Sequence, residues 1–145
     1  MRTVGSRSAI FASPLIFRVL LALALLIINY LAFSPTETPI VTNLNDKASH
    51  ILAFLCLAFL VDFSWPISRW NLPKIASLIS YGLFIEVVQF FLPNRLFSLW
   101  DLAADAIGLL CYPLILPLLL KIHIFESRYN SSAKASSPDR AGRLP

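Results

Sequence analysis

The stretch "LIFRVLLALALLIINYLAF", Leu15 to Phe33, decides the fold of this chain. Its 19 residues contain one charged side chain, Arg18, and as a helix they are long enough to cross the roughly 30 Å hydrocarbon core of a bilayer. The run also exceeds the roughly 7 to 15 residues of a signal-peptide core. It is therefore interpreted as a retained membrane span.

The composition extends this interpretation to the whole chain. Its 145 residues are 57% hydrophobic and 14% charged, and its mean hydropathy is +0.72. Such a chain is too apolar for an ordinary soluble domain. The net charge of +4 lies in tails and loops beside apolar runs, without interleaved aromatic residues, so no nucleic-acid partner is expected. Cys56 and Cys111 lie inside apolar runs and are expected to be small buried hydrophobes.

Three more apolar runs follow, at about Asp46 to Phe63, Pro73 to Pro93 and Trp100 to Leu120, and Pro113 and Pro117 are expected to bend the last one. The predicted fold is all-α: a polytopic membrane protein with a four-transmembrane-helix bundle. The expected division is a cytoplasmic segment at 1–14, the membrane domain at 15–122 and a polar, disordered tail at 123–145.

Lys and Arg are distributed unequally between the two sides that four spans define. With the N-terminus inside, ten of the 12 basic residues face the cytoplasm and two, Lys47 and Arg95, face outside. Cytoplasmic flanks retain an excess of Lys and Arg. Both termini are therefore predicted to be cytoplasmic, in a multi-pass protein of the plasma or inner membrane.

The polar residues of the spans then gather in the outer half of the membrane. Asp46 and His50 are four residues apart on one helix face, and Glu86 and Gln89 are three apart on another. Glu86 lies roughly 10 Å below the outer end of its helix, where an ionised carboxylate is costly. We therefore predict a polar pocket that opens to the outer leaflet. Its residues are Asp46, Lys47, His50, Glu86, Gln89, Arg95, Ser98, Asp101 and Asp105.

The spacing of four residues on the last span, Asp101, Asp105, Gly108 and Tyr112, forms one stripe that is expected to face the bundle interior. Gly108 of this stripe and Gly82 of the third span are expected to allow close helix packing. Asn29 approaches the same level from the first span. The matching stripe on the third span consists of Gly82, Glu86, Gln89 and Pro93.

Several of these residues also have a purely structural interpretation. Ser98 fits the N-cap of the last helix, with Asp101 completing a capping box, and Asn45 or Asp46 could cap the second helix. His50 could be a packing residue. Lys47 and Arg95 could simply extend into water, and Asp62 and Arg18 are expected at the inner interface. Glu86 has no such explanation, and an ion pair with Arg95 or Lys47 is its simplest internal partner.

Three blocks of the sequence resemble one known family. "DKASHILAFLCLAF" (46–59) is similar to the Asp-Lys-x-x-His-x-x-x-Phe signature of VanZ-like membrane proteins, and "EVVQFFLPNRLFSLWDLAADAIG" (86–108) is similar to that family's Glu-x-x-Gln, Arg, Ser, Asp and Gly pattern. Asp105 departs from the family, which more often has asparagine there. The resemblance implies an envelope accessory protein, with an association to glycopeptide (teicoplanin) resistance. Its signature positions here are Asp46, Lys47, His50, Phe54, Glu86, Gln89, Arg95, Ser98, Asp101 and Gly108.

The predicted function is that of a non-enzymatic binding or accessory protein of the cell envelope. Its expected partners are membrane lipids, with a lipid-linked envelope intermediate or a glycopeptide as candidate ligand, and no cofactor is expected. The four acids against Lys47 and Arg95 leave a formal charge of −2 with neutral His50. The alternative is a small membrane enzyme acting on a lipid-linked substrate, with His50 or Glu86 as general acid or base and a divalent metal on Asp101 and Asp105. Proton-coupled transport and a purely structural ion-pair network are the remaining hypotheses.

Overall fold

The structure is a computed structural model, and the part of the chain that it describes is all-helical. Its four helices are α2 (Pro14–Phe33), α3 (Asn43–Ser64), α4 (Leu72–Phe90) and α5 (Leu99–Leu120). All four are long and apolar enough to cross a membrane. The predicted four-helix membrane fold is confirmed. The described residues are 14–34, 43–66, 68–93 and 97–121, with the side chains of 43–45 left out.

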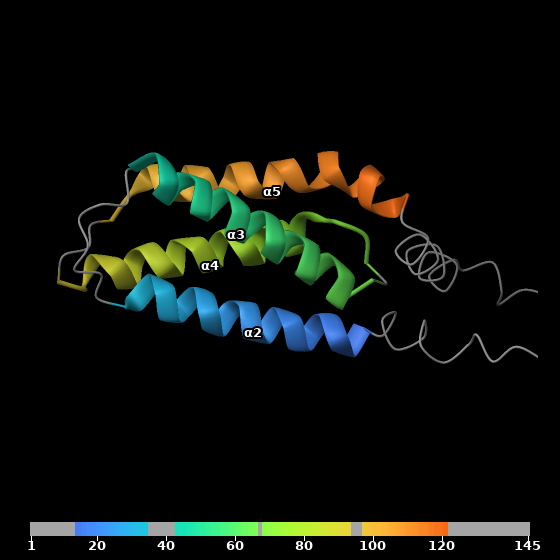
Figure 1. Cartoon of the computed structure of the whole chain (residues 1–145), viewed down its shortest axis with the longest axis horizontal. Helices are drawn as coiled ribbons and strands as arrows, with labels where there is room; N and C mark the ends of the chain where they lie inside the picture. Colours follow the sequence, from blue (N-terminus) through green and yellow to red (C-terminus); the bar gives the residue numbers. More distant parts are fainter. Residues whose placement is uncertain (1–13, 35–42, 67, 94–96, 122–145) are drawn as a thin grey trace, which may run out of the picture.

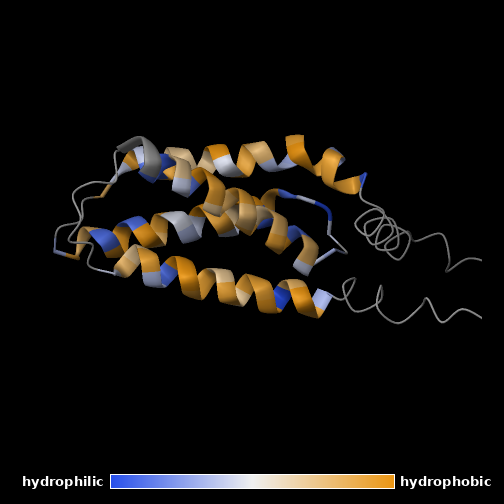
Figure 2. Cartoon of the chain, viewed as in Figure 1, coloured by the Kyte–Doolittle hydropathy of each residue, from blue (hydrophilic) through white to orange (hydrophobic). Residues whose placement is uncertain are grey.

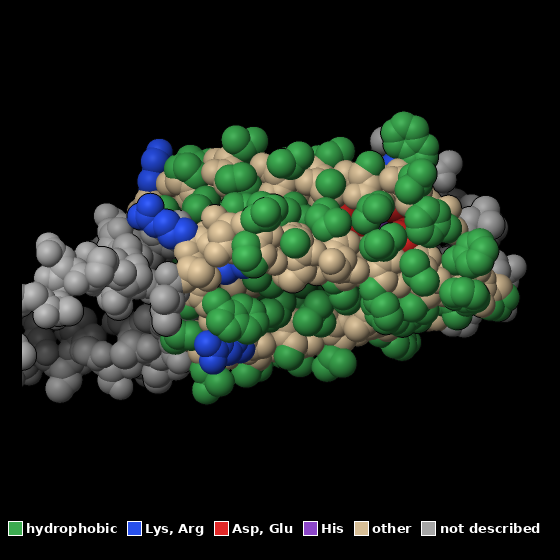
Figure 3. All heavy atoms as spheres, turned by 180° about the vertical axis from the view of Figure 1, so that it is seen from behind, with side chains coloured by type: hydrophobic (Ala, Val, Ile, Leu, Met, Phe, Trp, Pro, Cys, Tyr) green, Lys and Arg blue, Asp and Glu red, His purple; other side chains and the backbone are tan. Residues whose placement is uncertain are grey.

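The helices form an antiparallel bundle in which α3 is central (Figure 1). Its most extensive contacts are with α5 and α2, which lie on opposite sides of it. The start of α2 and the end of α5 lie at the same end of the bundle. Apolar residues dominate the helices, and exposed Leu, Ile and Phe side chains cover the outside, as a lipid-facing surface requires (Figures 2 and 3). Which side of the membrane holds the termini stays a prediction.

Two glycines set how closely the helices approach. An added Cβ on Gly108 of α5 would lie 2.4 Å from the carbonyl oxygen of Ile51 on α3. An added Cβ on Gly82 of α4 would lie 2.5 Å from Oδ2 of Asp105 and 3.1 Å from the ring of Phe54. Only glycine therefore lets α5 and α4 pack this closely against α3, as predicted for both positions.

The helix ends follow local capping chemistry. Ser98 caps α5, because its hydroxyl accepts a hydrogen bond from the amide of Asp101 at 3.3 Å. Asn71 caps α4 in the same way. The third helix was predicted to reach Pro93 but ends at Phe90: the amides of Phe91 and Leu92 turn back to the carbonyls of Val88 and Gln89. Proline disfavours helical backbone in the residue before it, so a helix that ends short of Pro93 is consistent with this rule.

The two ends of the bundle differ in charge. We call the end that carries Arg18, Arg69, Lys74 and Lys121 the basic end, and the other end, with Asp46, Lys47, Glu86 and Asp101, the polar end. Figure 3 shows the blue Lys and Arg side chains at one end of that face and red acidic side chains toward the other. Lys and Arg are thus concentrated at the end of the described bundle where α2 begins and α5 ends.

An ion-pair network closes the basic end. Lys74 donates to Asp62 at 2.7 Å, to the carbonyl of Trp65 at 3.0 Å and to the carbonyl of Ser68. The hydroxyl of Tyr112 donates to the second oxygen of Asp62 at 2.6 Å. Asp62 lies in the last turn of α3, and its carboxylate is buried within the bundle, where a cation and a phenol compensate its charge.

The cysteines also differ from expectation. Neither forms a disulfide, and Cys56 is exposed on the outer face of α3 while Cys111 is half-buried. The expected burial of Cys56 is therefore wrong. A thiol is apolar enough to face lipid from a membrane span, which explains its exposure.

Candidate functional site

Three helices bring the predicted pocket residues to the polar end. The first turns of α3 carry Asp46, Lys47 and His50, the last turns of α4 carry Glu86 and Gln89, and α5 begins here with its cap and two acids, Ser98, Asp101 and Asp105. Because α3 and α5 start at this end, the free amides of their first turns also face it. The predicted inward stripe of α5 is confirmed, since Asp101, Asp105, Gly108 and Tyr112 are all buried. Pro93 lies beyond the end of α4.

An ion pair joins the N-terminal turns of α3 and α5. The ammonium of Lys47 lies 2.7 Å from Oδ1 of Asp101, with 35% of the Lys47 side chain and 12% of the Asp101 side chain exposed. Ser98 caps α5 as predicted, but the carboxylate of Asp101 pairs with Lys47 and does not complete the capping box. Lys47 is partly exposed but bonds Asp101, so it does not simply extend into water.

A second polar contact lies one turn deeper in both helices. Nδ1 of His50 lies 2.8 Å from Oδ1 of Asp105. Asp105 is nearly fully buried, and its other oxygen packs against Gly82. The carboxylate thus holds the imidazole in one orientation. His50 is therefore more than a packing residue, because it makes a polar contact with Asp105.

Glu86 occupies the interior of the cluster. It is 0% exposed, and its Oε2 accepts a hydrogen bond from the backbone amide of Ser98 at 2.8 Å. Its Oε1 has no hydrogen-bond partner among the described residues. The predicted pairing with Lys47 is wrong, because Lys47 bonds Asp101 instead. The predicted partner Arg95 lies outside the described residues.

Two amide side chains join α2 to α4. Gln89 donates to the carbonyl of Ala32 at 3.2 Å, and Asn29 accepts from the hydroxyl of Tyr81 at 2.9 Å. Asn29 therefore belongs to a separate α2–α4 contact and not to the polar cluster. Gln89 sits where α2, α3 and α4 meet.

A cavity of about 210 Å³ opens between α2, α3 and α4 beside the cluster. This volume is roughly seven times the ~30 Å³ that a water molecule occupies in the liquid. Most of the lining is apolar, and four polar side chains contribute the rest. The lining residues are Ile28, Leu31, Ala32, Asp46, Ser49, His50, Ala53, Phe54, Ile85 and Gln89.

A larger cavity of about 480 Å³ lies toward the basic end, between α2, α3 and α4. Its lining is mostly apolar, and Lys74, the charged residue in it, already bonds Asp62 and two carbonyls. Such a surface suits an acyl chain but provides little for recognising a particular headgroup. We therefore assign the candidate site to the smaller cavity.

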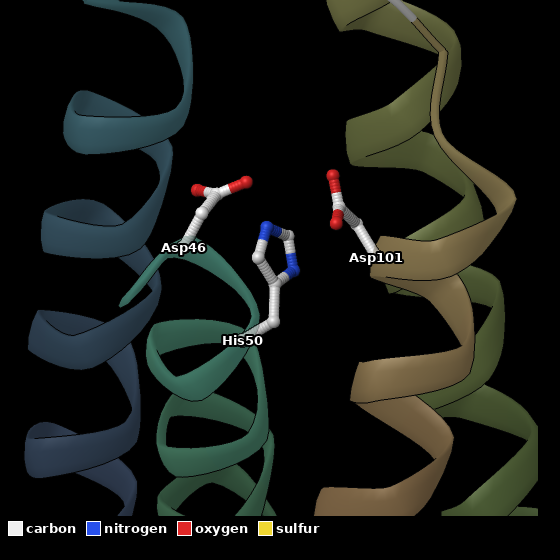
Figure 4. Close-up of side chains that lie close together, drawn as sticks. All are labelled: Asp46, His50 and Asp101. Atoms are coloured by element: carbon white, nitrogen blue, oxygen red, sulfur yellow. The ribbon is translucent and has the colours of Figure 1, made fainter. Parts of the chain in front are cut away.

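Three possible metal-ligand side chains converge at the mouth of the site. One ligand atom each from Asp46, His50 and Asp101 lies within 4.8 Å of the others, and Figure 4 shows the His50 ring between the two carboxylates. The sequence suggested Asp101 and Asp105 as the metal ligands, but the converging group contains Asp101 and not Asp105. Asp105 is bonded to His50 and buried against Gly82.

The charge of the cluster is strongly negative. Its four acids face one described cation, Lys47, so the described residues carry a formal charge of −3 with neutral His50. An excess of carboxylate oxygens accepts hydrogen bonds or binds cations, and it does not favour a free anion. The site is thus an acceptor-rich pocket.

The sequence missed two parts of this arrangement. The α2 wall of the cavity, Ile28, Leu31 and Ala32, lies in a uniformly apolar helix in which no pattern marks one face as the lining. The Lys74, Asp62 and Tyr112 network was also missed, because Asp62 and Lys74 belong to different spans. That the pocket residues bind or catalyse stays a prediction.

A sequence model of the VanZ/LLP1 family matches residues 16–121. The chain is similar to the "Uncharacterized protein C11E3.10" of Schizosaccharomyces pombe, with 33% identity over 90 residues, which are 59% of this chain and 54% of the yeast protein. The chain thus spans about half the length of the curated relative that it matches. No solved structure matches the chain.

Proposed function

The chain belongs to the VanZ/LLP1 family, and from this premise we propose that it is a non-enzymatic membrane protein that binds the headgroup of an envelope lipid at the polar end. The observation that carries the proposal is the lining of the 210 Å³ cavity, which is mostly apolar but includes the polar side chains of Asp46, Ser49, His50 and Gln89. A lipid presents the same division, with a polar headgroup joined to apolar chains. The cavity therefore matches a lipid better than it matches a fully polar solute.

The polar lining favours a headgroup with hydrogen-bond donors. The carboxylate of Asp46, the amide oxygen of Gln89 and the hydroxyl of Ser49 all line the cavity and are able to accept hydrogen bonds. Hydroxyl and ammonium groups supply such donors, whereas a quaternary choline headgroup has none. The net negative charge of the cluster also favours an ammonium group over a free anion.

The size of the cavity sets an upper limit on what enters it. Pockets for drug-sized ligands enclose roughly 300–1,000 Å³, so 210 Å³ holds a headgroup and not a whole glycopeptide antibiotic. A glycopeptide is larger than an ordinary drug. We therefore favour the lipid or a lipid-linked intermediate as ligand and treat any effect on a glycopeptide as indirect.

We place the site at the extracytoplasmic leaflet because Lys and Arg are concentrated at the opposite end of the bundle. A single cysteine at Ser98→Cys, in a chain with Cys56 and Cys111 changed to Ser, tests this assignment. A membrane-impermeant maleimide should label it in intact cells. Labelling only after the cells are permeabilised would place the polar end in the cytoplasm.

The binding proposal is tested with purified protein in detergent, to which phosphatidylethanolamine, phosphatidylglycerol or phosphatidylcholine is added and bound lipid is counted by native mass spectrometry. The first two should be retained at least severalfold better than phosphatidylcholine. Gln89→Leu should weaken this retention, because it removes a polar lining group and keeps a similar volume. Leu52→Ala, on the exposed face of α3, is the matched control. Equal retention of all three lipids, or no effect of Gln89→Leu, contradicts headgroup recognition.

The His50–Asp105 contact favours an acid/base enzyme as the second candidate function. A carboxylate that orients an imidazole is a common arrangement for a general base, and His50 lines the cavity. Glu86 is a poor alternative base, because it is 0% exposed and bonded to Ser98. Chemical change in the bound lipid that is lost in His50→Ala would favour the enzyme, whereas recovery of intact lipid from the wild-type protein favours binding alone.

A further inference from the structure

We propose that Asp46, His50 and Asp101 form a binding site for one divalent transition-metal ion at the mouth of the cavity. The proposal rests on the contacts of these side chains. Only its last step, a headgroup oxygen as a further ligand of the ion, rests on the proposed function.

The geometry is close to that of a bound site. One ligand atom from each of the three residues already lies within 4.8 Å of the others, and the His50 ring lies between the two carboxylates (Figure 4). Ligand atoms about 2.0–2.2 Å from a metal lie roughly 3–3.5 Å apart. Closing the set around an ion thus requires the most distant of these atoms to approach by up to about 1.3–1.8 Å, through rotation of the side chains. The side chains of Asp46 and His50 are partly exposed, so an ion has access.

Asp105 prepares His50 for this role. Its contact with Nδ1, at 2.8 Å, leaves Nε2 as the ring nitrogen that is available to a metal. Metal-binding histidines usually donate their other ring N–H to a carboxylate or carbonyl, which fixes the tautomer and raises the basicity of the ligand. Asp105 is itself held in place by burial against Gly82. It is therefore a positioning residue and not a ligand.

Glu86 provides independent evidence that a positive charge belongs here. This carboxylate is 0% exposed, and its Oε1 has no hydrogen-bond partner in the described part of the chain. Its other oxygen, Oε2, accepts from the amide of Ser98, three residues before Asp101, so the carboxylate lies beside the cluster. A carboxylate oxygen that is buried in a membrane protein without a hydrogen bond is costly. A divalent ion would change the formal charge of the described cluster from −3 to −1 and would reduce that cost.

The ligand types select the class of ion. Imidazole suits Zn²⁺, Fe²⁺ and Ni²⁺, whereas a site for Mg²⁺ or Ca²⁺ is usually made of oxygen atoms alone. Three protein ligands of mixed nitrogen and oxygen type leave a coordination position open, as in zinc sites that bind a water or a substrate. That position would take an oxygen of the headgroup. Zn²⁺ is therefore the reference ion, and Co²⁺ is its spectroscopic substitute.

The experiment uses the full chain in detergent, stripped with a chelator and dialysed against Zn²⁺ without lipid. We expect one tightly held Zn²⁺ per chain and a Co²⁺ absorption band. His50→Ala and Asp46→Asn should each weaken binding at least tenfold, and Asp105→Asn by about tenfold through the orientation of the ring. Asp62→Asn is the matched control: it removes a buried carboxylate at the basic end and should leave metal affinity unchanged. The site is overturned if the wild-type protein holds no more Zn²⁺ than His50→Ala. It is also overturned if none of the four variants changes the Zn²⁺ affinity.

Lys47 separates a metal site from a structural ion-pair network. Because Lys47 bonds Oδ1 of Asp101, it competes with the ion, and Lys47→Gln should tighten Zn²⁺ binding by roughly threefold to tenfold. Weaker binding in Lys47→Gln would overturn the proposal. Lipid retention with and without chelator keeps the two proposals apart: unchanged retention in a metal-free protein supports headgroup binding alone, and metal binding without retention supports the ion alone.

Discussion

Gly108→Ala should separate α3 from α5. An added methyl group at this position would lie 2.4 Å from the carbonyl oxygen of Ile51 and 3.1 Å from the amide of Leu55. Ordinary contact begins at 3.4 Å, so the two backbones must move apart by about an ångström. Backbone atoms have no rotamer with which to escape, so the relaxation must involve the whole helix.

The magnitude follows from two opposing terms. Overpacking a close contact typically costs about 1–3 kcal/mol, and a backbone clash belongs at the upper end. Replacing glycine by alanine inside a helix returns about 1 kcal/mol. We therefore expect the free energy of unfolding to fall by about 2 kcal/mol. An ångström of separation would also lengthen the His50–Asp105 contact from 2.8 Å to about 3.8 Å, beyond hydrogen-bond range.

The assay is unfolding of the purified protein by titration from mild detergent into sodium dodecyl sulfate. Ala103→Ser, on the exposed face of α5, is the control and should change stability by about 0.5 kcal/mol or less. Gly82→Ala should cost less than Gly108→Ala, because its new Cβ meets the ends of side chains, Asp105 and Phe54. Wild-type stability in Gly108→Ala, or a larger loss in Gly82→Ala, would refute the close α3–α5 contact.

The ion pairs and one buried phenol give two further predictions. Lys74→Met should cost about 3–5 kcal/mol in the same titration, because it leaves the carboxylate of Asp62 buried, whereas Lys47→Met should cost much less, because Lys47 and Asp101 reach solvent. Equal losses would mean that the two ends do not differ in burial. Tyr112→Phe should cost about 1.5–3 kcal/mol, because it removes a hydrogen bond to the ionised Asp62. A loss below about 0.5 kcal/mol would show that this bond contributes little.

The helices were predictable because the length of an apolar run can be read from consecutive residues, without knowledge of the tertiary contacts. The predicted span at 15–33 differs from α2 by one residue at its start, and the one at 100–120 differs from α5 by one residue. The inward faces of α4 and α5 were predictable from the spacing of small and polar residues, such as Gly82 with Glu86 and Asp101 with Asp105. The third helix was predicted too long, because Pro93 was taken as its end although the turn closes at Phe91 and Leu92.

The partner of each polar residue was not predictable in the same way. Sequence spacing places Lys47, Glu86 and Asp101 at one depth, but it does not fix the rotation of α3 relative to α5. The close contact at Gly108 limits that rotation, and in the resulting arrangement Lys47 forms an ion pair with Asp101. Glu86 then finds the backbone amide of Ser98, a donor that side-chain patterns do not reveal. Sequence therefore predicted which residues meet and left open which of them bond.

The contrast between the two ends indicates where function lies. At the basic end Lys74 is 7% and Asp62 is 2% exposed, and three acceptors surround the ammonium group, so that network is closed and neutral. At the polar end four acids face one described cation, which is 35% exposed. A network that served only to hold helices together would be expected to balance its charge, as the Lys74–Asp62 pair does. The unbalanced end is the one with an accessible imidazole beside a cavity, and a ligand that brings positive charge or hydrogen-bond donors would complete it.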